Sequence, residues 1–167
     1  MSESGHDDTD HPLSLIHIFV ALLLRLQDLI LLTPERVAST FRQDAARAIA
    51  RSLEGQATIN EDQSPASGIE FPADLLIEAP NRKPVAVFLA QSEQRVLEAV
   101  VAQMAITYEA ASDCSVIALL EKDSSISRKM LRHASNRLTA MPIFEGDERA
   151  AIQRIVREVL GHQTTVH

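Results

Sequence analysis

The sequence predicts an α/β fold in which helices flank a mixed sheet of about four strands with a central antiparallel hairpin. Three short runs, at residues 71–78, 85–90 and 115–120, are almost continuously apolar, which is typical of strands covered on both faces. A tight turn around Asn81 joins the first two runs and is short enough for an antiparallel hairpin. An amphipathic helix predicted over 92–111 separates the second run from the third, which favours a parallel crossover.

Length and composition limit the fold and the classes of function. A chain of 167 residues fits one domain, and 46% hydrophobic residues suffice for a buried core. The chain has no Trp and one Tyr, which argues against a base-stacking platform. A net charge of −7 opposes non-specific binding of the whole surface to nucleic acid or anionic membrane. The single cysteine, Cys114, excludes an internal disulfide, and we expect a reducing, cytoplasmic environment.

The N-terminal part differs from the rest of the chain. Residues 1–12 are polar and acidic, and we expect a disordered tail there. Residues 13–32 are apolar on nearly every helical face, and their length suits a membrane span. However, Arg25 and Asp28 lie past the middle of that segment, where ionised groups oppose insertion. We therefore expect an apolar helix that packs against the protein or a partner, rather than a membrane anchor.

A third interpretation of this segment is that part of it is an artefact. The hexapeptide at residues 13–18 is similar to the translation of a transposon-end adapter used in preparing sequencing libraries. On this interpretation, residues up to about Ile18 are not native sequence.

The main domain is predicted to span residues 33–161, followed by a short tail at 162–167. Thr33-Pro34-Glu35 is typical of a helix start, because Thr caps the helix, Pro fits its first position and an acid favours its first turn. Gly55 stands where a left-handed residue would end this helix. A short first strand is predicted at 57–60.

Two further helices are predicted after the last apolar run. One covers 125–139, with Asp123 or Ser124 as its cap, and the other runs from Asp147 to Gly161. Residues 142–144 form at most a short edge strand.

This order of elements resembles the core of the restriction-endonuclease-like nucleases, the PD-(D/E)xK group. In that fold a helix precedes three strands, the second and third strands form a hairpin, and a helix leads to a fourth strand. Active members carry an Asp on the second strand and an acid-x-Lys on the third, which bind a divalent metal such as magnesium. Pro72-Ala73-Asp74 matches the first element loosely, with one residue inserted. The second element is missing, because residues 85–90 contain neither an acid nor a lysine.

A narrower resemblance covers residues from about 57 to 159. This part is similar to the C-terminal half of a group of uncharacterised bacterial proteins with paired domains of unknown function, the second of which is thought to be nuclease-like. The stretches that carry the similarity are 71–78, 85–91 and 94–108. The resemblance implies a degenerate nuclease-like domain without an established activity.

Asp74 has two interpretations. A carboxylate on a strand covered on both faces must be hydrogen-bonded, so Asp74 can accept backbone N–H groups or pair with Arg82, Lys83 or Arg95. Alternatively, Asp74 is a catalytic metal ligand, and Lys83 or Glu93 would then complete an atypical site that binds magnesium. We favour the structural role, and expect no cofactor.

The predicted helix at 125–139 carries four cations, Arg128, Lys129, Arg132 and Arg137, and no acid. The whole chain has a net charge of −7, and without these four cations it would have −11. Such a local patch can bind phosphates or an acidic protein partner. It can equally be a solvated face whose cations favour the helix C-terminus.

Together these observations favour a bacterial nuclease-like domain that has lost its catalytic residues and acts by binding a protein or nucleic acid. The first alternative is a metal-dependent nuclease with a migrated active site. The second is a membrane-tethered accessory protein that uses residues 13–32.

Overall fold

The computed structural model describes residues 17, 18, 20, 21, 34–108 and 113–161. The chain divides into two compact units, Met1–Thr40 and Phe41–His167. Our expectations for the acidic tail, for most of the apolar N-terminal helix and for the C-terminal tail fall outside the described residues. Within the described residues, none of the helices combines the length and apolarity that a membrane span needs.

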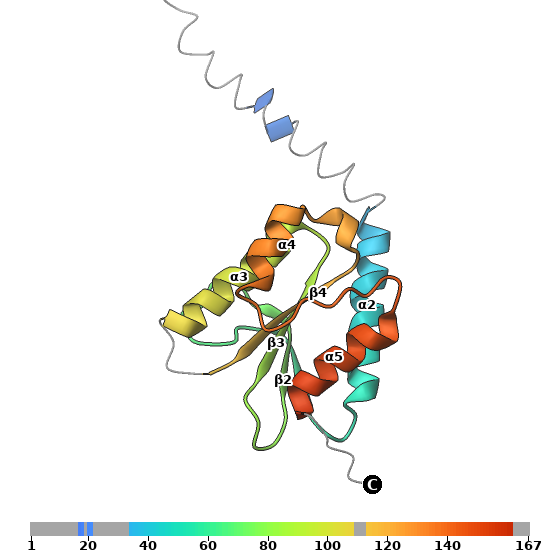
Figure 1. Cartoon of the computed structure of the whole chain (residues 1–167). Helices are drawn as coiled ribbons and strands as arrows, with labels where there is room; N and C mark the ends of the chain where they lie inside the picture. Colours follow the sequence, from blue (N-terminus) through green and yellow to red (C-terminus); the bar gives the residue numbers. More distant parts are fainter. Residues whose placement is uncertain (1–16, 19, 22–33, 109–112, 162–167) are drawn as a thin grey trace, which may run out of the picture. The chain divides into compact units, whose positions relative to one another are not determined.

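The sheet and the helices around it belong to the second unit, apart from the first turns of α2. In chain order the described elements are α2 (Pro34–Ser52), β1 (Thr58–Gln63), β2 (Ala73–Glu78), β3 (Val85–Ala90), α3 (Glu93–Tyr108), β4 (Ser115–Leu120), a 3₁₀ turn (Asp123–Ser125), α4 (Arg128–Ser135) and α5 (Glu148–Leu160). Figure 1 shows this arrangement. An α/β fold with a four-stranded mixed sheet was predicted, and the structure confirms it.

The strands lie in the order β1-β2-β3-β4. β1 and β2 are antiparallel, as are β2 and β3, where Leu75 lies opposite Val87. β4 is parallel to β3 along its full length, because α3 returns the chain to the same end of the sheet. The predicted hairpin and the predicted crossover are therefore both present. The first strand is longer than the predicted 57–60, since it continues to Gln63.

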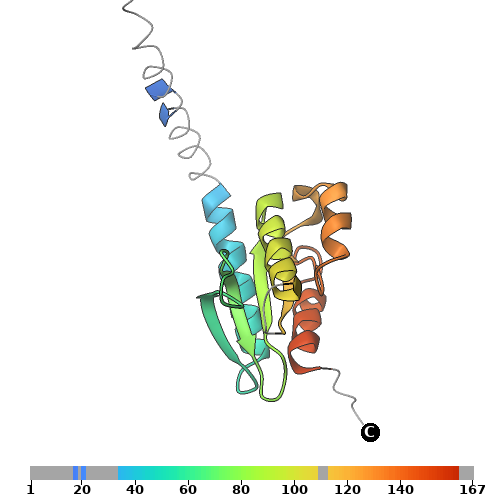
Figure 2. The same cartoon turned by 90° about the vertical axis from the view of Figure 1, so that its left-hand side faces the viewer.

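Helices cover both faces of the sheet, as the apolar strands require. On one face, α2 from Phe41 onward and α5 pack against side chains such as Ile77 and Val87. On the other face, α3 and α4 pack against side chains such as Phe88 and Ala118. Figure 2 shows α3 in front of the sheet. Every residue of β3 and β4 is buried, which confirms that these strands are covered on both sides.

The apolar residues of α3 do not form the single stripe that their spacing suggests. Val96 and Val100 are buried against the sheet, whereas Leu97, Val101, Met104 and Tyr108 are exposed. A helix presents only one side to a sheet, so the second apolar line has no partner among the described residues.

The hairpin turn depends on Asn81, whose φ of +60° lies in the left-handed region. We expect Asn81→Ala to lower the free energy of unfolding by about 1 kcal/mol, because alanine disfavours this conformation. Asn81→Gly should change it by less than about 0.5 kcal/mol, since glycine adopts positive φ freely. Urea denaturation followed by circular dichroism measures both values.

The matched control for this prediction is Asn136→Ala, because Asn136 has an ordinary φ of −79°. If Asn136→Ala and Asn81→Ala destabilise the protein equally, the turn does not require a left-handed residue.

Candidate functional site: the buried carboxylate of Asp74

Asp74 lies near the start of β2, and only 4% of its side chain is exposed. The strand is distorted at this point: Glu61 pairs with Leu75 and Gln63 pairs with Ala73, but Asp62 between them has a φ of +51°. Ala73 and Leu75 also pack into the cores on opposite faces of the sheet. In a regular strand they would share one face. The side chains of β2 therefore change from one face of the sheet to the other at Asp74. The Asp74 carboxylate can then accept a hydrogen bond from a backbone N–H of β3.

Four hydrogen bonds from three residues converge on this carboxylate. The backbone N–H of Leu89 in β3 donates to Oδ2 at 2.7 Å. Arg95 of α3 donates to the same oxygen through Nη2 at 2.8 Å and Nε at 3.3 Å. Arg42 of α2 donates through Nη2 to Oδ1 at 2.5 Å. Asp74 thus connects α2, β2, β3 and α3 through charge-assisted hydrogen bonds.

Arg95 is itself held by several groups. Its Nη1 donates to Glu98 at 2.5 Å, its Nη2 donates to the carbonyl oxygen of Pro72 at 3.0 Å, and its guanidinium lies 4.7 Å from the ring centre of Phe88. Burial lowers the pKa of Arg95, but the hydrogen bonds and charges of Glu98 and Asp74 outweigh burial and raise it above its ordinary value. Arg95 therefore remains a cation beside Asp74.

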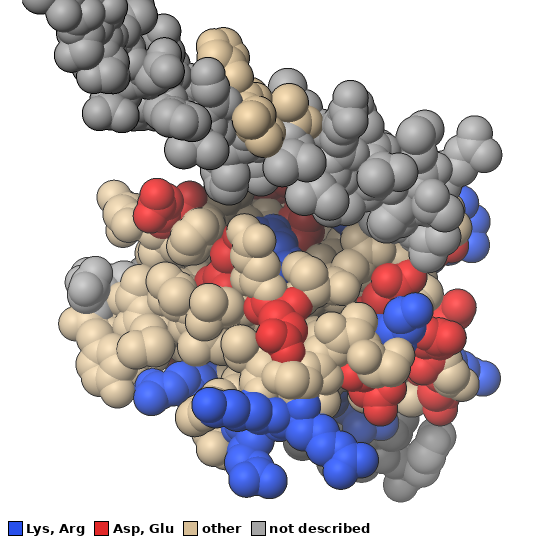
Figure 3. Space-filling view, turned by 90° about the horizontal axis from the view of Figure 1, so that it is seen from above, with Lys and Arg blue, Asp and Glu red and all other residues tan. Residues whose placement is uncertain are grey.

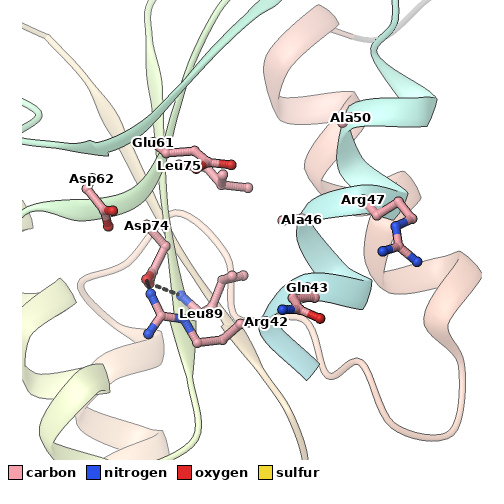
Figure 4. Close-up of a pocket in the computed structure, with 10 residues that line it drawn as sticks. All are labelled: Arg42, Gln43, Ala46, Arg47, Ala50, Glu61, Asp62, Asp74, Leu75 and Leu89. Carbon is pink, nitrogen blue, oxygen red and sulfur yellow. Dashed lines mark hydrogen bonds and ion pairs between the residues drawn. The ribbon is translucent and has the colours of Figure 1, made fainter. Parts of the chain in front are cut away.

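Arg42 approaches from the open side of the site. It lines a pocket of about 530 Å³ together with Asp74 and with Asp62 on the neighbouring strand. In Figure 4, Arg42 reaches from α2 to Asp74, whereas Arg47 on the same helix points away. The Arg42 side chain is 52% exposed, compared with 22% for Arg95. Arg95 is therefore the more buried of the two counter-charges, and Arg42 closes the site toward solvent.

The residues that the nuclease alternative needs are not assembled around Asp74. Lys83 lies in the turn at the other end of the β2–β3 hairpin, with its Nζ 3.9 Å from Asp113. Glu93 accepts the backbone N–H of Ser127 at 2.6 Å, and hydrogen bonding from the side chain and then the backbone of Ser127 lowers its pKa. Both side chains thus have other partners.

The residues around Asp74 do not fit a magnesium ion. Magnesium prefers several oxygen ligands in octahedral geometry, but the side chains of β3 are all aliphatic or aromatic. Across the described residues, no three His, Cys, Asp or Glu side chains are grouped as a metal would require. In addition, Arg42 and Arg95 place two positive charges against the carboxylate. These cations repel a divalent ion.

The basic helix is shorter than the predicted 125–139. Its cap is Ser127, whose Oγ accepts the N–H of Met130 at 3.2 Å, rather than Asp123 or Ser124. The chain leaves the helix at Asn136 because the next residues run beside β4. There the N–H of Thr139 donates to the carbonyl oxygen of a β4 residue at 2.9 Å. The predicted strand at residues 142–144 amounts to one isolated bridge.

Arg128, Lys129 and Arg132 lie on α4, and Arg137 follows the helix. All four are exposed, and none forms an ion pair with another described residue. Figure 3 shows Lys and Arg side chains gathered along one edge of the molecule. The cations are thus available for a partner.

Cys114 is buried, and burial raises the pKa of its thiol to about 11. It is therefore protonated at neutral pH, and a protonated thiol is a poor nucleophile.

Sequence reasoning identified Asp74 and gave backbone N–H groups, Arg82, Lys83 or Arg95 as its possible partners. A backbone N–H and Arg95 do bind it, whereas Lys83 contacts Asp113, no hydrogen bond or ion pair joins Arg82 to Asp74, and Arg42 was missed. The signal for Arg42 was weak. Arg42 follows the buried Phe41, and a residue beside a buried one can lie at the edge of the buried helix face. Its contact with β2 depends on the angle between helix and sheet, which the sequence pattern does not give.

Comparisons of the chain with protein-family models, with curated proteins and with solved structures found no match.

We expect Asp74→Ala to lower the free energy of unfolding by about 1–3 kcal/mol, because Leu89 N–H and the Arg95 guanidinium lose their acceptor. Asp74→Asn should have a smaller effect, since its amide oxygen can still accept the Leu89 N–H. Chemical denaturation measures both variants.

Asp62→Asn is the control for this prediction, because Asp62 lines the same pocket but is exposed. It should change stability by less than about 0.5 kcal/mol. Wild-type stability in Asp74→Ala would contradict a structural role for the carboxylate.

Proposed function

We propose that this protein is a catalytically inactive binding domain built on a restriction-endonuclease-like core. The order of elements supports this proposal: a helix is followed by β1, by the β2–β3 hairpin, by α3 and by β4 parallel to β3. This is the order that the resemblance implies. On this resemblance, Asp74 on the second strand would correspond, with one residue inserted in the motif, to the metal-binding Asp of active members.

One observation carries the proposal of inactivity: the Asp74 carboxylate is bound by two arginines. Metal-assisted hydrolysis of a phosphodiester needs a carboxylate that is free to bind the cation. Here Arg42 and Arg95 contact the two oxygens of Asp74, and Leu89 N–H donates to one of them. Asp74, which would bind the metal in an active nuclease, here stabilises the contact of α2 and α3 with the sheet.

The exposed cations of α4 support a binding role. They lie on a protein whose net charge is −7, and they have no ion-pair partner among the described residues. A local positive surface on an acidic protein attracts anionic partners while the rest of the surface repels them. The partner is thus an anionic surface of a protein or a nucleic acid.

We expect the purified protein not to cleave DNA. The test incubates it with supercoiled and linear DNA in the presence of magnesium or manganese. Agarose gels should show the DNA intact, because Arg42 and Arg95 occupy the Asp74 carboxylate and the described residues group no three acids as a metal would require.

The control is Asp74→Asn, assayed under the same conditions after its folding has been verified by circular dichroism. Metal-dependent cleavage by the wild type that disappears in a folded Asp74→Asn variant would show that the protein is a nuclease with an atypical site.

A further inference from the structure

Four apolar residues form an exposed line along α3, which we call the α3 stripe: Leu97, Val101, Met104 and Tyr108. Their exposed fractions are 48%, 43%, 38% and 74%. The residues are four, three and four positions apart, which is the spacing of a seam between two packed helices. Single exposed apolar residues are common on proteins, but a contiguous line of them marks an interaction site.

The α3 stripe lacks the charges of an ordinary solvated helix face. The nearest acids on α3 are already engaged, since Glu98 binds Arg95 and Glu93 accepts the N–H of Ser127. The stripe therefore suits another apolar surface rather than water.

The cations of α4 lie on the same side of the sheet as the α3 stripe. Buried residues of both helices, such as Val96 of α3 and Ala134 of α4, belong to the same core cluster. Arg128 and Arg132 lie on the side of α4 away from Ala134, just as the stripe lies on the side of α3 away from the core. Figure 2 shows α4, in orange, beside α3, in yellow. The exposed sides of the two helices thus form one surface.

We propose that the α3 stripe and the cations of α4 together bind a helix of a partner protein, one face of which is apolar and one edge acidic. This inference rests on the proposed binding function and names its partner class. An amphipathic helix lays its apolar face along an apolar surface, and opposite charges at the edge fix its direction. The spacing of the stripe fits the apolar face, and the unpaired arginines fit the acidic edge.

The same observations disfavour nucleic acid and a second copy of the chain as occupants. Nucleic acid would use Arg128 and Arg132, but its phosphates make no favourable contact with Leu97 or Val101. A two-fold dimer through this surface would place the α3 stripe and the α4 cations of one copy against the same residues of the other copy. The α4 cations of both copies would then share one interface without acids to balance them.

The test uses the full chain and two synthetic helical peptides of about 18 residues, long enough for partial helicity in water. Both carry leucines at alternating three- and four-residue spacing. One has glutamate and the other has lysine on both flanks of the leucine line. Fluorescence anisotropy measures the dissociation constant of each peptide, and duplex DNA and single-stranded RNA are measured in parallel.

We expect the glutamate peptide to bind at least about tenfold more tightly than the lysine peptide, since each factor of ten corresponds to about 1.4 kcal/mol. Two double variants should each weaken this binding at least about tenfold, through the loss of central contacts. Leu97→Gln with Val101→Gln replaces two of the four apolar residues of the α3 stripe without changing charge. Arg128→Glu with Arg132→Glu reverses the charge of the edge.

The control variants are Arg149→Glu and Gln153→Asp on α5, which covers the other face of the sheet. They change charge at exposed positions and should leave binding unchanged. Thermal unfolding of each variant verifies that it is folded.

Three results would overturn the proposal: no binding of the glutamate peptide up to about 1 mM, equal binding of both peptides, or binding that survives the stripe variant. Binding of DNA or RNA that Arg128→Glu with Arg132→Glu abolishes, without peptide binding, would assign the surface to nucleic acid. None of these results depends on the nuclease assay, so failure of the inference can be distinguished from failure of the proposed function.

Discussion

A carboxylate buried between a sheet and two helices must be balanced by donors, and this requirement organises the centre of the molecule. Asp74 satisfies it with Leu89 N–H from β3, Arg42 from α2 and Arg95 from α3. An unpaired charge at this position would strongly destabilise the fold, whereas a paired one contributes less to stability than to fixing which groups meet. The hydrogen bonds hold helices on both sides of the sheet to the same strand, so Asp74 fixes the register of two helices at once.

The same arrangement separates the interior of the protein from the exposed surface that we propose binds a partner. Arg95 is directed inward, where it contacts Asp74, Glu98 and the ring of Phe88. The side of α3 that faces away from the sheet carries the α3 stripe, and α4 adds its cations beside it. A charged cluster under α3 thus fixes the helix in place, and none of the described residues covers its outer side. A rigid support of this kind lowers the entropic cost of binding.

Much of the fold followed from local sequence patterns. The hairpin, the parallel crossover and the burial of β3 and β4 could be predicted because their signals lie within a few residues: continuous apolar runs, a turn residue and a helix between strands. The bounds of α4 could not, because its end depends on how the following residues pair with β4. A capping residue predicts a helix start only where a single candidate is present, and here Asp123 and Ser124 were equally good candidates close to the actual cap, Ser127.

The candidate site was less predictable than the fold. Burial of Asp74 and its need for donors followed from an acid on an apolar strand, but Arg95 was only one of three candidate partners, with Arg82 and Lys83. The role of Arg42 required the angle at which α2 crosses the sheet, and the distortion at Asp62 has no signature in the sequence. The exposure of the α3 stripe also escaped prediction. Periodicity identifies apolar residues, but the width of the face that the sheet covers depends on the neighbouring helices.

The most direct test of the central claim is whether a divalent ion reaches the Asp74 carboxylate. Manganese broadens the nuclear magnetic resonance signals of nearby amides, and Leu89 N–H donates directly to Asp74. Because Arg42 and Arg95 repel a cation, any broadening of the Leu89 amide signal by manganese should come from the exposed acids Glu61 and Asp62 of the same pocket and should be equal in the wild type and in a folded Asp74→Asn variant. Broadening of the Leu89 signal in the wild type that disappears in folded Asp74→Asn would show that Asp74 binds metal and would contradict the structural role assigned to it here.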